Sequence, residues 1–408
     1  MNTRHYGGFV TDFDGAQLSR LASRLTSPQS FVGVLGNLRR DAVELLGGNP
    51  ASEALPAEAL NASVHELLAD PARATAALRY SGPRGLDEFV AWLAAREGID
   101  PARIVVTNGG LHALSLVTQA LLDAGDSVVT DDPIFPIALR VLQLTGAHAV
   151  PVPVGRDGLD VEALERLLAE GVRPRAVYTV ADFQNPTGAV LGARARTRLV
   201  ELAERFGFVV LSDNPYRTSR FAGEDVPDFP TDSDRVVRIN TFAKSLGPGL
   251  RLGWLALPSW LVQPVLNIRA RTDQHPSTFT QAAILGVVRP AGAFDRILAD
   301  LSALHHSRAT TLATSLRTHL AGHIEAERPD GGFFIWARLL DPALSLEPLH
   351  HAALAHGTNF SRGTSFAVPG GHDHDRHLRL GFSDIPDTDL EEAVTRLAAA
   401  VSTAGGGA

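Results

Sequence analysis

The sequence predicts an α/β fold: a large domain with a mainly parallel, mixed seven-stranded sheet, and a smaller α/β domain built from both termini. Two observations support this prediction. Short β-rich runs alternate with helical patterns between about Ser63 and Pro290, which is typical of a parallel sheet with helices on both faces. A long stretch with apolar residues at helical spacing, residues 296–323, then leads into a second set of helical and β-rich segments.

The large domain is expected to contain seven strands. They are Arg103–Thr107, Ser127–Thr130, His148–Val154, Ala176–Val180, Phe208–Leu211, Val236–Asn240 and Leu252–Leu257. Helical patterns lie between most of them, including Leu111–Leu122, Val161–Glu170 and Ala193–Phe206. A helical connection returns the chain to the same end of the sheet, so most of these strands are expected to pair in parallel.

The small domain is expected to draw on both ends of the chain. Its C-terminal part contains Gly331–Ala337, His351–His356, Leu378–Phe382 and a helix over Thr388–Val401. Residues before about 60 show little periodicity, apart from a helix near Asp14–Leu25. We expect residues 1–60 to form an N-terminal segment and part of the small domain, 61–290 the large domain, 291–402 the C-terminal small domain, and 403–408 a disordered tail.

The composition excludes several classes of protein. The 408 residues include no cysteine, which excludes disulfides, thiol catalysis and cysteine-bound zinc. The net charge is −8 and there is no basic block, so we expect no nucleic-acid partner. The sequence has no run of about 18 apolar residues, and Met1–Val10 has no signal-peptide core. We therefore expect no membrane partner and a cytoplasmic location.

Lys244 lies in the most informative segment, Thr241–Gly253, between two β-rich runs. An α/β sheet binds its ligands beyond the carboxyl ends of its strands, and Lys244 follows one such run. A lysine amine can form a Schiff base with a carbonyl, while a hydroxyl (Thr241) and an arginine (Arg251) can bind a phosphate. Together these groups indicate a phosphorylated aldehyde cofactor, pyridoxal 5′-phosphate (PLP). The alternative is a surface lysine in a Gly/Pro turn.

Chemically useful groups also follow four other strands. Gly110 opens a helix, where free N–H groups attract an anion, although an ordinary tight turn is the alternative. Phe135 could stack on a flat ring or serve in packing. Asn185 lies in a polar turn. Asp213 ends an apolar strand, where a carboxylate is costly unless paired, and a pyridinium N–H would pair with it; a helix cap is the alternative.

In combination these residues resemble the class I and II aminotransferases, which have PLP fold type I. The resemblance rests on three motifs: Asn185-Pro186-Thr187-Gly188, Asp213-x-x-Tyr216 and Lys244-x-x-x-Pro248-Gly249-x-Arg251-x-Gly253. The order and spacing of the motifs agree as well, and the similarity extends from about Gly48 to Ser383. The resemblance implies a PLP-dependent aminotransferase that forms a homodimer with shared active sites.

The resemblance also implies a role for each matching residue. Lys244 would bind the cofactor covalently and transfer the proton, and Asp213 would pair with the ring nitrogen. Asn185 and Tyr216 would form hydrogen bonds with the 3′-oxygen of the cofactor, and Phe135 would stack on its ring. Lys244, Asp213 and Tyr216 are the catalytic candidates.

Two further groups of residues are implied to bind the phosphate and the substrate. The phosphate ligands would be Gly110, Leu111, Thr241, Arg251 and, from the neighbouring subunit, Tyr80. The substrate ligands would be Arg379, Asn185 and Gly48. A planar guanidinium such as that of Arg379 suits a carboxylate, and a surface arginine on an edge strand is the alternative.

The implied reaction moves an amino group from an L-amino acid to a 2-oxo acid, with 2-oxoglutarate or pyruvate as the default acceptor, by a ping-pong mechanism. A β/γ-lyase, a racemase or an oxidase would carry nearly the same residues, so these remain alternatives. A PLP-sensing transcription regulator is a remote alternative, because only about 45 residues precede Gly48 and they include no basic recognition helix. We interpret the cluster from His372 to His377 as an exposed loop and predict no metal site.

Overall fold

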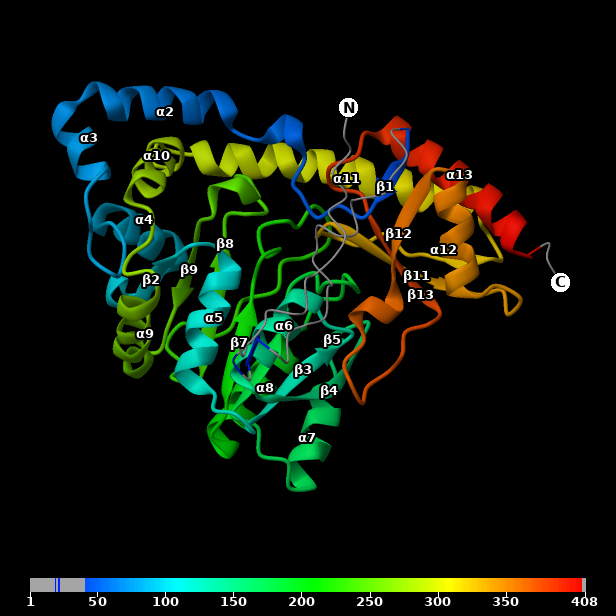
Figure 1. The fold of residues 1–408 in the computed structure, drawn as a ribbon, viewed down its shortest axis with the longest axis horizontal. Helices are drawn as coiled ribbons and strands as arrows, with labels where there is room; N and C mark the ends of the chain where they lie inside the picture. Colours follow the sequence, from blue (N-terminus) through cyan, green and yellow to red (C-terminus); the bar gives the residue numbers. More distant parts are fainter. Residues whose placement is uncertain (1–18, 20, 23–40, 406–408) are drawn as a thin grey trace, which may run out of the picture. The chain divides into compact units, whose positions relative to one another are not determined.

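The computed structural model describes residues 19, 21–22 and 41–405. The helix expected near Asp14–Leu25 lies almost entirely outside these residues. The described residues 41–405 belong to one compact unit, so the domain boundaries at 60, 290 and 402 remain predictions. The unit contains an eight-stranded sheet and a five-stranded sheet (Figure 1).

The large sheet confirms the seven expected strands and adds a short one at its edge. Its order is β2 (Ile104–Thr107), β9 (Gly253–Ala256), β8 (Val236–Thr241), β7 (Val209–Asp213), β6 (Ala176–Thr179), β3 (Ser127–Asp132), β4 (His148–Gly155) and β5 (Gly158–Leu159). The sheet is mixed because β9 is antiparallel to both β2 and β8. The added strand β5 has two residues and pairs antiparallel with β4. The central strands β8, β7, β6, β3 and β4 are parallel, as expected.

Helices cover both faces of the large sheet. One face packs against α5 (Gly110–Leu121), α6 (Pro136–Thr145) and α9 (Ser259–Thr272). The other face packs against α4 (Asp87–Glu97), α7 (Val161–Ala169), α8 (Ala193–Phe206) and α10 (Thr278–Val288). Alternate residues of one strand serve the two faces: Val209 and Leu211 contact the first layer, and Val210 contacts the second.

The small sheet combines an early strand with strands from the C-terminal part. Its order is β1 (Val43–Leu45), β12 (Thr358–Arg362), β13 (His377–Gly381), β11 (Phe334–Leu339) and β10 (Ile324–Glu325). Strand β1 pairs in parallel with β12, so its partner lies far away along the chain. A three-residue strand is too short to produce a recognisable pattern.

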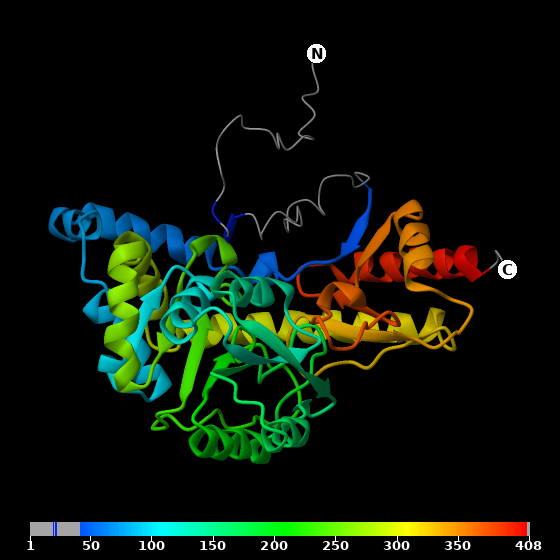
Figure 2. The ribbon, with the colours of Figure 1, turned by 60° about the horizontal axis from the view of Figure 1, so that its bottom comes forward.

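The C-terminal helices differ in detail from the expected ones. Helix α11 (Ala293–His319) ends before residue 323, because residues 324–325 form β10. In both views it extends from the helices around the large sheet to those around the small sheet (Figures 1 and 2). Helix α13 (Asp387–Gly405) includes residues 403–405, so half of the tail predicted to be disordered is helical. Residues 406–408 lie outside the described part.

The remaining helices are short or connect the sheets. They are α2 (Ala57–Ala69), α3 (Pro71–Ala77), α12 (Leu346–Ala355), and the 3₁₀ turns η2 (Ser52–Ala54), η3 (Pro101–Arg103), η4 (Pro248–Leu250) and η5 (Gly363–Phe366). Helix α2 packs on α10, where the Ser63 hydroxyl donates to the carbonyl of Ala283 at 2.7 Å. Within the described residues, no helix is both long enough and apolar enough to cross a membrane.

A buried ion pair fixes the loop that follows β6. Arg196 of α8 donates to Asp182 at 2.9 Å, and both side chains are buried. The same guanidinium donates to the carbonyls of Ala181 and Leu191. Arg217 also donates to Asp182, at 3.2 Å. Because a buried charge needs a partner, this cluster holds the loop in one conformation as it approaches the site.

We expect Asp182→Ala to lower the free energy of unfolding by about 3–5 kcal/mol, because it removes the nearer carboxylate of the buried Arg196 and leaves only Asp228, at 3.6 Å. Chemical denaturation measures this change. Asp225→Ala is the matched control: it removes an exposed carboxylate paired with Arg217 at 2.9 Å, and we expect a loss of at most about 1 kcal/mol. Equal losses in the two variants would contradict the structural role of the buried pair.

Candidate active site

The side chain of Lys244 lies between the two sheets. Its Nζ donates to the carbonyl of Gly48 at 2.6 Å and lies 5.8 Å from the ring centroid of Tyr216 and 5.7 Å from that of Phe333. Burial, together with the positive charge of Arg379, lowers the pKa of Lys244 to about 8, while the charge of Asp213 opposes the shift. The amine is therefore partly neutral near neutral pH.

Asp213 ends β7 on the face of the sheet that also carries Tyr178. Its Oδ2 accepts a hydrogen bond from the Tyr178 hydroxyl at 2.7 Å. Burial raises the pKa of Asp213 to about 6, whereas the hydrogen bond from Tyr178 and the charge of Lys244 lower it. No hydrogen bond from the described residues reaches Oδ1, so this carboxylate can accept one more from a ligand.

Arg379 comes from β13 of the small sheet and contacts the large one. Its Nη1 donates to Oδ1 of Asn185 at 3.0 Å, and its Nη2 donates to the carbonyl of Leu46 at 2.9 Å and to the hydroxyl of Ser361 at 3.2 Å. The guanidinium lies 3.9 Å above the centroid of the Phe334 ring. Burial lowers the pKa of Arg379 to about 10.

The Tyr216 hydroxyl and Nε of Arg379 are two further polar groups near Lys244 and Asp213. The pKa of the Tyr216 hydroxyl is raised by burial, although the charge of Arg379 and a hydrogen bond from Asn185 lower it. Nε of Arg379 is buried and has no hydrogen-bond partner among the described residues. A buried N–H without an acceptor is costly, so it marks a place where a ligand oxygen would be stabilised.

A second group surrounds the beginning of helix α5. Gly109 has φ +87°, and a Cβ built on it would lie 2.9 Å from Nη2 of Arg251. A Cβ on Gly110 would lie 3.5 Å from the Cβ of Thr241. The first N–H groups of an α-helix have no partner within the helix and bind anions. Together with the arginine and the hydroxyl, this turn can hold a phosphate.

Three predicted residues lie apart from these contacts. Tyr80 is 87% exposed, and its ring meets that of His275 edge-on at 5.6 Å. Leu111 lies in the first turn of α5 with 39% of its surface exposed. Phe135 is the N-cap of α6 and packs against the core beneath it. The other predicted residues make the contacts given above.

The histidine cluster near residue 374 has a structural partner. Nε2 of His374 lies 2.8 Å from Oδ1 of Asp132, and the backbone N–H of His372 donates to Oδ2 of the same carboxylate at 2.8 Å. This carboxylate fixes the loop to the end of β3. In the part of the chain that the structure describes, no group of three or more His, Asp or Glu side chains is arranged to hold a metal ion.

Several side chains of the site have no counterpart among the predicted residues. They are Tyr178, Phe333, Phe334 and Ser361. The Gly331-Gly332-Phe333-Phe334 motif was the only available signal, because a pair of glycines allows the chain to approach Phe183 closely before the aromatic pair begins. Tyr178 has the spacing of an ordinary core residue in a strand, so its hydrogen bond to Asp213 is visible only in three dimensions.

Comparisons with known proteins agree with this geometry. The family model for aminotransferase class I and II matches residues 48–397. The chain belongs to the class I and II aminotransferases. Such aminotransferases use PLP, so this member is a PLP-dependent enzyme with PLP fold type I. The resemblance inferred from the three motifs is thereby confirmed.

Individual relatives cover nearly the whole chain. Aromatic-amino-acid aminotransferase 1 of Thermococcus litoralis is 29% identical over 373 residues, 88% of this chain and 87% of the relative. The 2-aminoadipate transaminase of Thermus thermophilus is 29% identical over 360 residues, 87% and 89% of the two chains. The structure of LysN, an alpha-aminoadipate aminotransferase from Thermus thermophilus complexed with N-(5′-phosphopyridoxyl)-L-leucine, matches with TM-score 0.86 and 28% identity, covering 95% of this chain and 97% of that one.

The residues present fit PLP. Oδ1 of Asp213 can accept from a protonated ring nitrogen, and Gly109 leaves space beside Arg251 that a Cβ would fill. The Lys244 amine has a lowered pKa, as an amine that reacts with an aldehyde requires. These are the chemical groups that a phosphorylated pyridine aldehyde needs.

We expect Tyr178→Phe to weaken the binding of PLP about tenfold, because Asp213 loses a hydrogen bond to its charged form and its pKa rises. Equilibrium dialysis of the cofactor at neutral pH measures the change. The loss should shrink as the pH rises and Asp213 ionises in both proteins. A loss independent of pH would show that the hydroxyl acts on packing alone.

Proposed function

We propose that this enzyme transfers the amino group of an L-amino acid to a 2-oxo acid, with 2-oxoglutarate or pyruvate as acceptor. The observation that carries the proposal is the position of the Lys244 amine: buried, with a pKa of about 8, and close to both Tyr216 and the substrate-side segment at Gly48. A lysine with a lowered pKa can act both as the attachment point for an aldehyde and as a base.

Each residue would act on a different part of the cofactor or the substrate. When bound, PLP withdraws electrons from the substrate's Cα, so that the bond to its proton weakens. Neutral Lys244 accepts this proton at Nζ. Ionised Asp213 would favour a protonated ring nitrogen, and the Asn185 and Tyr216 side chains would form hydrogen bonds with the 3′-oxygen. Phe135 would stack on the ring.

Two sets of residues would bind the phosphate of the cofactor and the carboxylate of the substrate. The phosphate would be held by Gly110, Leu111, Thr241, Arg251 and Tyr80 of the partner subunit. The substrate carboxylate would be held by Arg379, whose buried Nε has no acceptor in the described part of the chain, with Asn185 and Gly48 beside it. The exposure of Tyr80 supports its use across a homodimer, because 87% of its surface is open to a second subunit.

The amino donor and the reaction type are tested together. Amino acids, including the aromatic ones and 2-aminoadipate, are added singly to the cofactor-loaded enzyme, and the cofactor spectrum is followed. We expect the aminated cofactor and one equivalent of the matching 2-oxo acid, and parallel lines in double-reciprocal plots when the acceptor is varied. Release of ammonia, inversion of the amino acid, or a requirement for oxygen would instead identify a lyase, a racemase or an oxidase.

The pKa of Lys244 predicts how the enzyme takes up its cofactor. Only the neutral amine attacks an aldehyde, so the rate of covalent PLP capture should rise about tenfold per pH unit below pH 8 and level off above it. The rise in absorbance of the bound cofactor measures this rate by stopped flow. Lys244→Ala should show no covalent capture at any pH.

Arg379→Met provides the sharper comparison. Because the charge of Arg379 lowers the pKa of Lys244, its removal should raise that pKa and move the capture profile to higher pH. Arg198→Met removes an exposed arginine that is paired with Glu165 and Glu201, and it should leave the profile unchanged. An unchanged profile in Arg379→Met would show that the two cations do not interact.

A further inference from the structure

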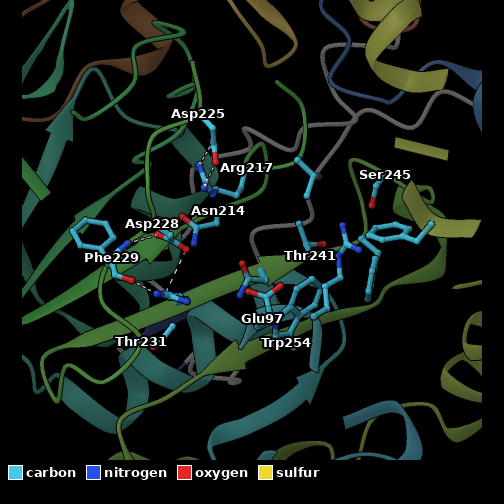
Figure 3. Close-up of a pocket in the computed structure, with 16 residues that line it drawn as sticks. Glu97, Asn214, Arg217, Asp225, Asp228, Phe229, Thr231, Thr241, Ser245 and Trp254 are labelled. Atoms are coloured by element: carbon cyan, nitrogen blue, oxygen red, sulfur yellow. Dashed lines mark hydrogen bonds and ion pairs between the residues drawn. The ribbon is translucent and has the colours of Figure 1, made fainter. Parts of the chain in front are cut away.

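A cavity of about 630 Å³ lies on the face of the large sheet opposite to that of Asp213 and Tyr178 (Figure 3). Its wall contains the ends of β7, β8 and β9 and the C-terminal end of α4. The loop Arg217–Thr231 provides another side. A volume of this size falls within the range of small-molecule sites in proteins.

A row of three hydrogen-bond donors lines this cavity, and none of them has a partner among the residues that the structure describes. They are Nδ2 of Asn214, Nδ2 of Asn240 and Nε1 of Trp254, and all three residues are at least nine-tenths buried. Asn240 pairs directly with Trp254 across β8 and β9, and Asp213 pairs with Ile239, which places Asn214 level with Asn240. Successive residues of a strand alternate between faces, so the three donors share one face.

Glu97 provides a carboxylate in the same cavity as these three N–H donors. It ends α4 and lines the same cavity, and its carboxylate forms no hydrogen bond or ion pair with any of residues 19, 21–22 and 41–405. Burial raises its pKa, although the charges of Arg238, Arg96 and Arg217 lower it. A half-buried carboxylate in this position is stabilised by a cation that approaches it.

The arginines of the cavity are already paired. Arg96 donates to Asp295 at 3.0 Å, Arg217 to Asp225 at 2.9 and 3.1 Å, and Arg238 lies 3.4 Å from Asp228. The binding capacity that remains therefore consists of three neutral N–H groups and one carboxylate. The N–H groups need an acceptor, and Glu97 needs a donor with positive charge.

We propose that this cavity binds a small zwitterionic amino acid. The ligand's carboxylate accepts from Asn214, Asn240 and Trp254, and its ammonium group binds Glu97. Such a ligand carries no net charge, so it adds none to a cavity whose arginines are compensated. A lone carboxylate would leave Glu97 unpaired, and a lone amine would leave the three N–H groups unpaired.

The position of the cavity couples it to the active site. Asn214 directly follows Asp213, and Asn240 directly precedes Thr241, which itself also lines the cavity, so the two sites use neighbouring residues at the ends of β7 and β8. Ser245, next to Lys244, also lines the cavity. An amino acid bound here would therefore restrict the strand ends that carry the cofactor ligands.

The test uses the cofactor-loaded enzyme after borohydride reduction, so that the active site cannot turn over. L-Leucine and other L-amino acids are titrated by calorimetry, with 4-methylpentanoate and isopentylamine as the two half-molecules of leucine. We expect saturable binding of an amino acid at the cavity and at least about tenfold weaker binding of each half-molecule. Equal binding of either half-molecule would overturn the zwitterion assignment.

Variants assign the binding to this cavity. Trp254→Phe removes one N–H and Glu97→Gln removes one charge without a large change in shape, and each should weaken binding about tenfold. Arg379→Met changes only the active site and should leave this binding intact. Loss of binding in Arg379→Met but not in Glu97→Gln would overturn the proposal, as would a crystal structure, grown with the amino acid, that shows only water in the cavity.

Discussion

The active site depends on one arginine that joins the two sheets. Arg379 belongs to β13 of the small sheet, yet it donates to Asn185 beyond β6 of the large sheet and to the carbonyl of Leu46 in the segment after β1. The same segment is held at Gly48 by Lys244 and at Asn49 by the hydroxyl of Ser383. The backbone carbonyls of this segment thus accept hydrogen bonds from three side chains outside it. These bonds position the substrate side of the site, although the segment has no regular secondary structure of its own.

Burial then determines the charges at this junction. It lowers the pKa of Lys244 to about 8 and raises that of Asp213 to about 6, and each charge partly opposes the other's shift. Both groups can therefore change protonation within about one or two pH units of neutrality, as proton transfer by a side chain requires. Phe333 packs near Lys244 and Phe334 packs against Arg379, and this packing keeps water away from both charged groups. The loss of water causes the pKa shifts, so the aromatic packing contributes to the chemistry.

The sequence predicted the large sheet well because each strand has enough residues to show a pattern, and glycine and polar turns mark the strand ends. It missed β1 and β12, since β1 has three residues and acquires its partner from a segment more than 300 positions away. In the site, the motifs located Lys244 and Asn185, which are polar residues in turns, and Asp213, a carboxylate at the end of an apolar strand. Tyr178 was missed because an aromatic residue inside a strand has the same pattern whether or not its hydroxyl binds a carboxylate.

Strand geometry explains how the candidate active site and the proposed amino-acid site can use adjacent residues of the chain. Asp213, at the end of β7, lies on one face of the sheet. Asn240 of β8 and Asn214, directly after β7, lie on the other face, beneath helices where apolar residues are usual. A buried polar group without a partner costs about 1–3 kcal/mol, and a whole domain is stable by only about 5–15 kcal/mol. Three such donors, which have no partner among the described residues, would together cost about 3–9 kcal/mol if they stayed unpaired. A molecule that satisfies them would stabilise the strand ends, and with them the residues on the other face that we propose to bind the cofactor.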